Sequence, residues 1–192
     1  MTFTDPVGDS GAKPDISGGS VRNDDAGMIT FTVTFANRPA LSTDDFVQII
    51  IDADNASWTG QDGFDYVIQY GFASNPSGIA LGHWDGTKYA IVPSTVSGSF
   101  SVGNLTVALS FRDLDDTARI QYYVHSETRH LEADPAYDDA PDGKDVYSYQ
   151  VKIPLLLDKF SAPAKVKAGK GASASMSMTF AAVRGLRSTL TL

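Results

Sequence analysis

The sequence has no cysteine among its 192 residues, so neither disulfides nor thiolate metal sites can hold the fold together. Glutamate is scarce as well, because Glu127 and Glu132 are its only two positions. No apolar run approaches the roughly 20 residues that a membrane-spanning helix needs. The segment Met1–Asp5 has neither a basic start nor an apolar core, so no signal peptide is visible. Stability must therefore come from a packed core, which a chain of this length can build.

Charge is distributed unevenly along the chain. Residues 1–151 carry 22 Asp and Glu against 8 Lys and Arg, whereas residues 152–192 carry 1 acid against 7 bases. An acidic body argues against binding to nucleic acids or anionic membranes, since both are bound by basic surfaces. It is compatible with cations, neutral sugars or basic partners. We therefore expect one domain over 1–151, followed by a linker and C-terminal strands over 152–192. Those strands either complete the main fold or belong to the truncated start of a following Ig-like domain.

Segments of alternating apolar and polar residues recur through the body. From Ile29 to Phe35 every second residue is apolar, which is typical of a strand with one buried face. Other segments with strand character are 46–51, 66–70, 79–84, 88–92, 96–102, 105–111, 118–125 and 146–153. Asp85-Gly86 and Gly103-Asn104 predict hairpin turns, and a short helical turn is expected near 112–117. About nine short strands predict an all-β fold, an antiparallel two-sheet β-sandwich of the jelly-roll or immunoglobulin-like kind.

Three segments are rich in Asp, Asn and Gly. Calcium takes about six to eight oxygen ligands, and short loops with acids at alternate positions can supply them. The candidate ligands in the first segment are Asp5 and Asp9. Those in the second are Asp52, Asp54, Asn55 and Asp65, and those in the third are Asp138 and Asp142. A cation is favoured at the second segment, because its acids would otherwise repel one another. For the third segment, residues 134–143, a solvated turn is equally compatible with the sequence.

A family resemblance appears in these same motifs. The opening DPxGD…PDI over residues 5–16, IDADN…TGxxGxDY over 51–66 and HWDG over 83–86 resemble the DOMON-like domains related to family 9 carbohydrate-binding modules. The similarity spans about residues 3–150. It implies a two-sheet sandwich in a secreted or cell-surface bacterial protein, structural calcium at the acidic loops, and ligand binding without catalysis. It also implies metal-site roles for Asp5, Asp9, Asp52, Asp54 and Asp65.

Aromatic residues offer candidate platforms for a ligand. Family 9 modules that bind sugar ends clamp the sugar between two aromatic rings, and no motif in this chain matches that pair. Most aromatic side chains here are expected to fill the core. The candidate sugar-binding rings are Trp58, Trp84 and Tyr137. Some DOMON domains bind haem through Met and His, and the side chains available for that are Met28, Met176, Met178, His83, His125 and His130.

The chain lacks the motifs of the common catalytic sites. No nucleophile elbow, zinc-protease helix or phosphate-binding loop occurs, so we expect that the protein is not an enzyme. The leading hypothesis is a calcium-stabilised extracellular binding or adhesion module, with a carbohydrate or a surface protein as its ligand. The competing hypothesis is a structural spacer or assembly domain with protein partners and no small ligand. Haem-mediated electron transfer is the third.

Overall fold

The computed structural model describes residues 1–71, 78–129, 137–152, 156–161, 177–181 and 187–191. The chain divides into two compact units, Met1–Lys152 and Ile153–Leu192. The second unit is an antiparallel sheet of β13 (Leu156–Ser161), β14 (Ser177–Ala181) and β15 (Arg187–Thr191) in that order. The sequence from Ser173 to Phe180 also has strand character, and of this segment residues 173–176 lie outside the described residues. The place of this unit in a complete domain stays a prediction.

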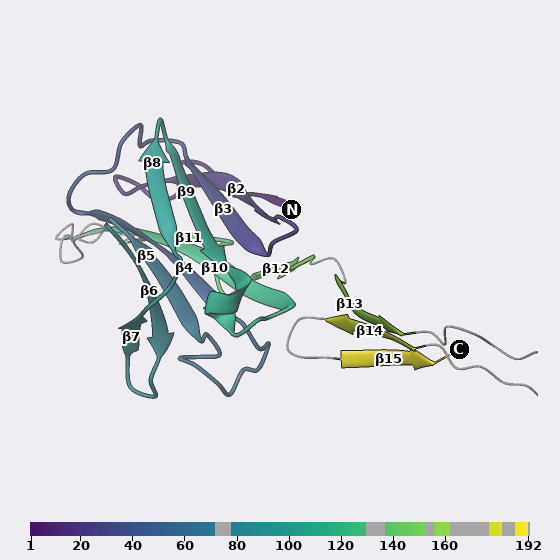
Figure 1. Ribbon diagram of the computed structural model, residues 1–192. Coiled ribbons are helices and arrows are strands. Elements are labelled where there is room, and N and C mark those ends of the chain that lie inside the picture. The colour runs from purple at the N-terminus through teal and green to yellow at the C-terminus, as the bar shows by residue number, and fades with distance from the viewer. Residues whose placement is uncertain (72–77, 130–136, 153–155, 162–176, 182–186, 192) are drawn as a thin grey trace, which may run out of the picture. The chain divides into compact units, whose positions relative to one another are not determined.

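The first unit consists of two antiparallel sheets that face each other (Figure 1). One has five strands in the order β1 (Thr2–Thr4), β2 (Ile16–Asn23), β3 (Met28–Phe35), β9 (Asn104–Ser110) and β8 (Ser97–Ser101). The other has seven strands and begins β11 (Tyr137–Ala140), β10 (Arg119–Thr128), β4 (Asp45–Asp52). It continues with β5 (Tyr66–Tyr70), β6 (Ile79–Trp84) and β7 (Tyr89–Val92), while β12 (Tyr147–Gln150) pairs with β10 beside β11. The predicted β-sandwich is confirmed.

The core lies between the two sheets and follows the alternation of the sequence. In β3 the side chains of Ile29, Phe31 and Val33 are buried, and in β10 every second residue from Ile120 is buried. The rings of Phe31 and Tyr122 meet edge to face across the two sheets, with centroids 5.2 Å apart. Each large apolar side chain buried in this way contributes about 1.5–3 kcal/mol to folding. Alternating residues on strands of both layers therefore hold the sandwich together.

The structure contains strands that the sequence analysis did not identify, namely β1, β2 and β11. The strand β2 includes Gly18-Gly19, a pair that is unusual inside a strand. A Cβ on Gly19 would meet the carbonyl oxygen of Thr32 at 2.2 Å and the ring of Phe3 at 2.6 Å. The glycines thus let β1 and its buried phenylalanine lie closely against the sheet. The described residues of the first unit form twelve strands, where about nine were predicted.

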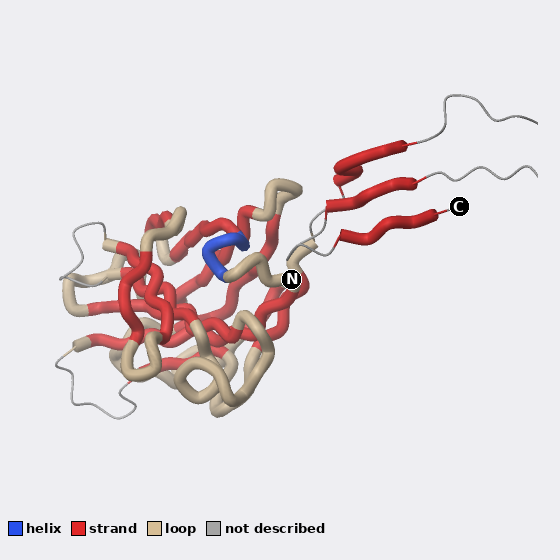
Figure 2. The backbone as a smooth tube through the Cα atoms, turned by 60° about the horizontal axis from the view of Figure 1, so that its bottom comes forward, coloured by secondary structure: helices blue, strands red, loops and turns tan. Residues whose placement is uncertain are grey.

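Helix is confined, among the described residues, to one short 3-10 turn, η1 (Phe111–Leu114), shown in blue in Figure 2. Ser110 caps this turn, because its hydroxyl accepts from the backbone N–H of Arg112 while Asp113 accepts from the N–H of Ser110. The predicted helical turn near 112–117 is confirmed, shifted slightly toward the N-terminus. No helix in the described part of the chain has the length and apolar character that crossing a membrane requires.

The hairpin between β8 and β9 differs by one residue from its prediction. Ser101 pairs with Asn104, so the two-residue turn is Val102-Gly103 and not Gly103-Asn104. Both turn residues have positive φ, 45° at Val102 and 75° at Gly103, as a type I′ turn requires. A β-branched residue is strained there, and the side chain of Val102 is 82% exposed, so its burial does not compensate.

We expect Val102→Asn to stabilise the protein by about 1 kcal/mol, because Asn-Gly is a preferred type I′ pair and the exposed valine makes little contact. The measurement is the midpoint of urea unfolding. Val7→Asn is the matched control, since Val7 is also exposed but lacks a positive φ, and it should give no gain. An unchanged or lower midpoint for Val102→Asn would contradict the assignment of strain.

Candidate metal centre

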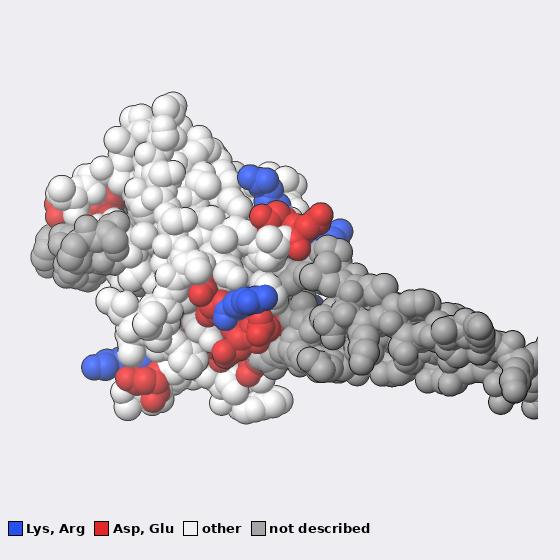
Figure 3. All heavy atoms as spheres, in the orientation of Figure 1, with Lys and Arg blue, Asp and Glu red and all other residues white. Residues whose placement is uncertain are grey.

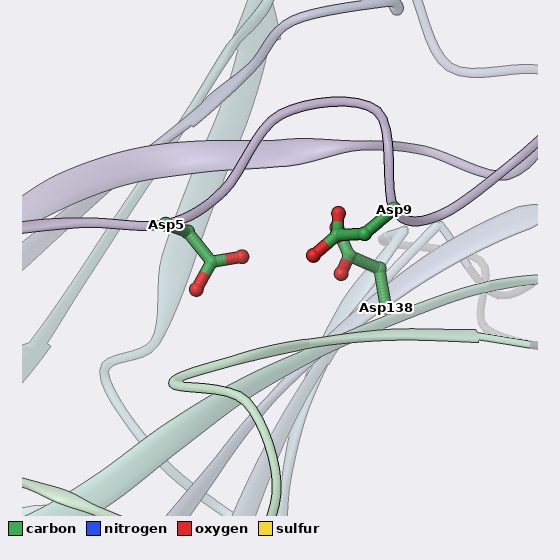
Figure 4. Close-up of side chains that lie close together, drawn as sticks. All are labelled: Asp5, Asp9 and Asp138. Atoms are coloured by element: carbon green, nitrogen blue, oxygen red, sulfur yellow. The ribbon is translucent and has the colours of Figure 1, made fainter.

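Acidic side chains form patches on the surface of the first unit, drawn in red in Figure 3. Three acidic side chains, two from the N-terminal segment and one from a strand far along the sequence, meet at one corner of the sandwich. Asp5 directly follows β1, Asp9 lies in the loop between β1 and β2, and Asp138 lies in β11. One carboxylate oxygen from each lies within 4.8 Å of the other two. Figure 4 shows the carboxylates of Asp9 and Asp138 side by side, with Asp5 opposite them. We call these three residues the corner cluster.

The loop that carries Asp9 is shaped by a buried carboxylate. The backbone N–H of Gly8 donates to both carboxylate oxygens of Asp15, at 3.1 and 3.0 Å. The backbone N–H of Asp15 in turn donates to the side-chain oxygen of Asn37, at 2.9 Å. The hydroxyl of Ser126 in β10 donates to the carbonyl of Pro14, at 2.6 Å. These bonds fix the loop against both sheets and so set the position of the corner cluster.

Asp5 is the least satisfied member of the cluster. Its side chain is only 9% exposed, and its Oδ2 atom is buried without a hydrogen-bond partner among the described residues. Burial, with the charge of Asp138 as the next contribution, raises the pKa of Asp5 to about 7. A buried carboxylate oxygen without a donor costs free energy that a proton or a cation can recover.

Asp138 is also buried in this cluster, and a hydrogen bond partly compensates the burial of its carboxylate. It is 4% exposed, and its Oδ2 accepts a hydrogen bond of 2.6 Å from the backbone N–H of Ile16. Burial raises its pKa to about 6, against the lowering effect of that hydrogen bond, and the charges of Asp9, Asp15 and Asp142 add to the rise. Asp138 therefore also favours a positive charge beside it.

The corner cluster fits a calcium ion. Calcium–oxygen bonds of about 2.3–2.6 Å let two ligand oxygens lie up to roughly 5 Å apart, and the cluster's oxygens meet that limit. A hollow of about 250 Å³, lined by Asp9, Asp138 and Asp142 among others, opens beside the cluster and gives an ion a way in. The unpartnered oxygen of Asp5 would gain a ligand bond. Asp5, Asp9 and Asp138 would hold the ion, with Asp142 beside them.

A second acidic group, which we call the loop cluster, joins Asp52, Asp54 and Asp65. One carboxylate oxygen of each again lies within 4.8 Å of the others. Here every carboxylate already accepts a backbone hydrogen bond: Asp52 from Asn55 at 2.6 Å, Asp54 from Ala56 at 2.9 Å, and Asp65 from Ala53 at 2.9 Å. Burial raises the pKa of Asp52, and the charges of Asp65 and Asp54 raise it further. Calcium at the loop cluster stays a prediction.

Asn55, a predicted ligand, is engaged with β10. Its side-chain nitrogen donates to the carbonyl of Arg119 at 3.2 Å, and its oxygen accepts from Gln121 at 2.9 Å. Its backbone has a positive φ of 59°, which asparagine tolerates better than most residues. In this arrangement Asn55 shapes the turn after β4.

The predicted sugar-binding rings are separated in the structure. Trp58 lies in the loop after β4 and is 85% exposed. Trp84 ends β6 and packs edge to face against Tyr89, with centroids 5.3 Å apart. Tyr137 begins β11, and its ring lies 5.3 Å from that of His125. Among the described ring contacts none joins two of the three, so they form no common clamp.

The side chains considered for haem are also apart. His125 has Nδ1 2.7 Å from Asp139 and Nε2 3.6 Å from Glu127, so both ring nitrogens face carboxylates. His83 lies in β6 with its ring against that of Tyr66, and Met28 begins β3 in the other sheet. Outside the described residues lie His130 and Met176, and the side chain of Met178 is likewise not described. This geometry gives haem ligation no support.

Sequence reasoning missed Asp15 as the residue that positions the corner cluster. The only signal was its place in the PDI motif of residues 14–16, which the resemblance includes without assigning a role. The third acidic segment, for which the sequence is equally compatible with a metal loop and a solvated turn, contributes Asp138 to the corner cluster, while Asp134 lies outside the described residues. The first and third segments thus contribute to one acidic cluster, and the second forms another.

Comparison with family models, with curated proteins and with solved structures gave no match for this chain. The resemblance to DOMON-like domains therefore stays a prediction that depends on the sequence motifs alone. The β-sandwich depends on the two sheets described above and is independent of that resemblance.

The raised pKa of Asp5 predicts how the calcium-free protein responds to pH. Its folded-state pKa of about 7 exceeds the usual 3.8, so the folded state keeps a proton that the unfolded state releases. The stability contributed by that proton is complete below about pH 4 and is lost as the pH rises through about 7. In calcium-free buffer, the Tm of the wild-type protein should therefore fall between about pH 5 and 7.5 more steeply than that of Asp5→Asn.

At about pH 7.5 the Asp5→Asn variant should exceed the wild-type Tm by on the order of a few °C in calcium-free buffer. Thermal unfolding followed by circular dichroism at several pH values measures both slopes. Asp25→Asn, an exposed turn residue, is the control and should follow the wild-type slope. Parallel slopes for wild type and Asp5→Asn would show that Asp5 titrates normally.

Proposed function

We propose that the first unit is a calcium-stabilised, non-catalytic binding module of a secreted or cell-surface protein, with a carbohydrate or a surface protein as its ligand. The observation that carries the calcium part is the corner cluster, in which the buried Oδ2 of Asp5 faces two further carboxylates without a hydrogen-bond donor. A cation there neutralises the repulsion and gives that oxygen a partner.

The chemistry of the cluster favours calcium over other ions. Its ligands are carboxylate oxygens, which suit hard cations such as calcium and magnesium. Magnesium requires nearly octahedral geometry at shorter bonds and keeps several waters, whereas calcium tolerates irregular loops. Extracellular calcium modules typically have Kd values of about 10⁻⁴–10⁻³ M, which suits a structural site in millimolar calcium.

The spacing of the acids supports a non-catalytic role. A glycosidase needs two carboxyl groups about 5–5.5 Å or 6.5–9.5 Å apart, so that a sugar or a water fits between them. Both clusters of the described chain instead group three carboxylates, with one oxygen of each within 4.8 Å of the other two, which is an arrangement suited to a shared cation. Loop acids of this kind are better explained as structural ligands.

Asp9→Ala should remove most of the stabilisation by calcium. Asp9 is exposed and makes no hydrogen bond among the described residues, so its loss should hardly change the Tm in chelator. At about 10 mM calcium, which is roughly 10 to 100 times a Kd of about 10⁻⁴–10⁻³ M, binding adds about 1.4–2.7 kcal/mol, which for a unit of this size raises Tm by roughly 3–10 °C. Thermal unfolding of wild type and variant, in chelator and in millimolar calcium, measures the effect.

The matched control is Asp25→Ala, which removes an exposed aspartate outside both clusters and should keep the full calcium shift. Metal analysis of the protein before and after chelator treatment shows whether the ion has been removed. The corner cluster would be refuted as the calcium site if calcium did not change the Tm of the wild-type protein, or if Asp9→Ala kept the full calcium-dependent shift of Tm.

A further inference from the structure

The outer face of the seven-stranded sheet carries two adjoining hollows, of about 310 and 650 Å³. Asp62, Phe64 and Tyr123 line both, so the two hollows adjoin at these residues, and we call them together the groove. Each volume lies in the range of about 300–1,000 Å³ that is usual for small-molecule sites. None of the three predicted sugar-binding rings lines either hollow.

The walls of the groove are held in place by the protein itself. The loop between β4 and β5 folds back over the sheet and brings Phe64 against Tyr123, with ring centroids 5.1 Å apart. The hydroxyl of Tyr89 in β7 donates to the carbonyl of Phe64 at 3.0 Å. Below these rings Ile50 and Val67 are buried and form an apolar floor. The groove is therefore formed before any ligand arrives.

Polar groups in the groove have hydrogen-bonding capacity to spare. The side chains of Gln48, Gln61 and Tyr123 make no hydrogen bond among the described residues. Gln121 uses its nitrogen to donate to Asn55 and keeps its oxygen for another donor. Amides and hydroxyls both donate and accept, so they complement a ligand that is covered with hydroxyl groups.

The charges of the groove disfavour anions and leave neutral or cationic ligands. The larger hollow is lined by the carboxylates of Asp52, Asp62, Asp139 and Asp145, with Lys144 as its one cation. Carboxylates repel phosphates, sulfates and uronic acids but accept hydrogen bonds from sugar hydroxyls. The rings of Phe64 and Tyr123 add apolar surface for the C–H face of a sugar.

We propose that this groove binds a neutral oligosaccharide, with Gln48, Gln61 and Gln121 bonding its hydroxyls and Tyr123 and Phe64 contacting a sugar ring. The inference extends the proposed function, because it names the ligand class and the surface of the binding module. It does not require calcium at either cluster, so the two claims fail separately. The acidic lining also makes a lysine-rich peptide the rival ligand.

Affinity electrophoresis in native gels tests the proposal with defined probes. The gels contain hydroxyethylcellulose, xylan, galactomannan or laminarin as neutral polymers, or polygalacturonate as an anionic one. We expect at least one neutral polymer to retard the protein and polygalacturonate to have no effect. Tyr123→Ala and Gln48→Ala should each weaken the apparent affinity by roughly tenfold.

Trp58→Ala is the matched control, since Trp58 is exposed in the loop but does not line the groove, and its affinity should stay at the wild-type value. Circular dichroism shows whether each variant is folded. Gln48→Ala removes no bond within the protein, so it still tests the groove if Tyr123→Ala misfolds. The calcium shift of Tm, measured on the same sample, tests the proposed function separately. Retardation by no neutral polymer, equal retardation of wild type and both groove variants, or binding only of a lysine-rich peptide in fluorescence anisotropy would overturn the proposal.

Discussion

The carboxylate of Asp5 is buried where the two sheets of the sandwich meet, and its Oδ2 has no hydrogen-bond partner among the described residues. Asp5 follows β1 at the edge of the five-stranded sheet, and Asp138 lies in β11 of the seven-stranded sheet. The N–H of Ile16 in β2 donates to Asp138, so backbone and carboxylate already connect the layers at this corner. A calcium ion there would clamp the two sheets, whereas without the ion burial raises the pKa of Asp5 to about 7, so that its carboxyl group is partly protonated at neutral pH.

The strands predicted from the sequence are those in which apolar residues carry the alternation. β3 shows this clearly, because Ile29, Phe31, Val33 and Phe35 alternate along it and are all buried. β11 was missed because its buried positions hold Asp138 and Ala140, so its pattern does not depend on apolar side chains. β2 was missed because Gly18-Gly19 interrupts the pattern, and the need for these glycines comes from Phe3 on a neighbouring strand. The local pattern of the sequence does not reveal such tertiary contacts.

The ligands of the candidate metal centre were predicted separately for each segment. That ligands from different segments lie close together in the fold could not be predicted from the sequence. Asp5 and Asp138 come together because Ser126 pairs with Asp138 in the register of β10 and β11, which the sequence does not state. The groove was missed for a similar reason. Alternation places Gln48 and Tyr123 on the outer face of their strands, but the hollow between them exists because Phe64 folds over the sheet from the next loop.

A crystal structure of the protein grown in millimolar calcium, with anomalous diffraction recorded at long wavelength, tests the central claim most directly. The account predicts an anomalous peak at the corner cluster, with oxygens of Asp5, Asp9 and Asp138 at about 2.3–2.6 Å from it. It also predicts that the Oδ2 of Asp5, which has no partner among the described residues, is one of those ligands. A corner without a peak, in which that oxygen instead accepts a hydrogen bond from water or from the protein, would contradict the account.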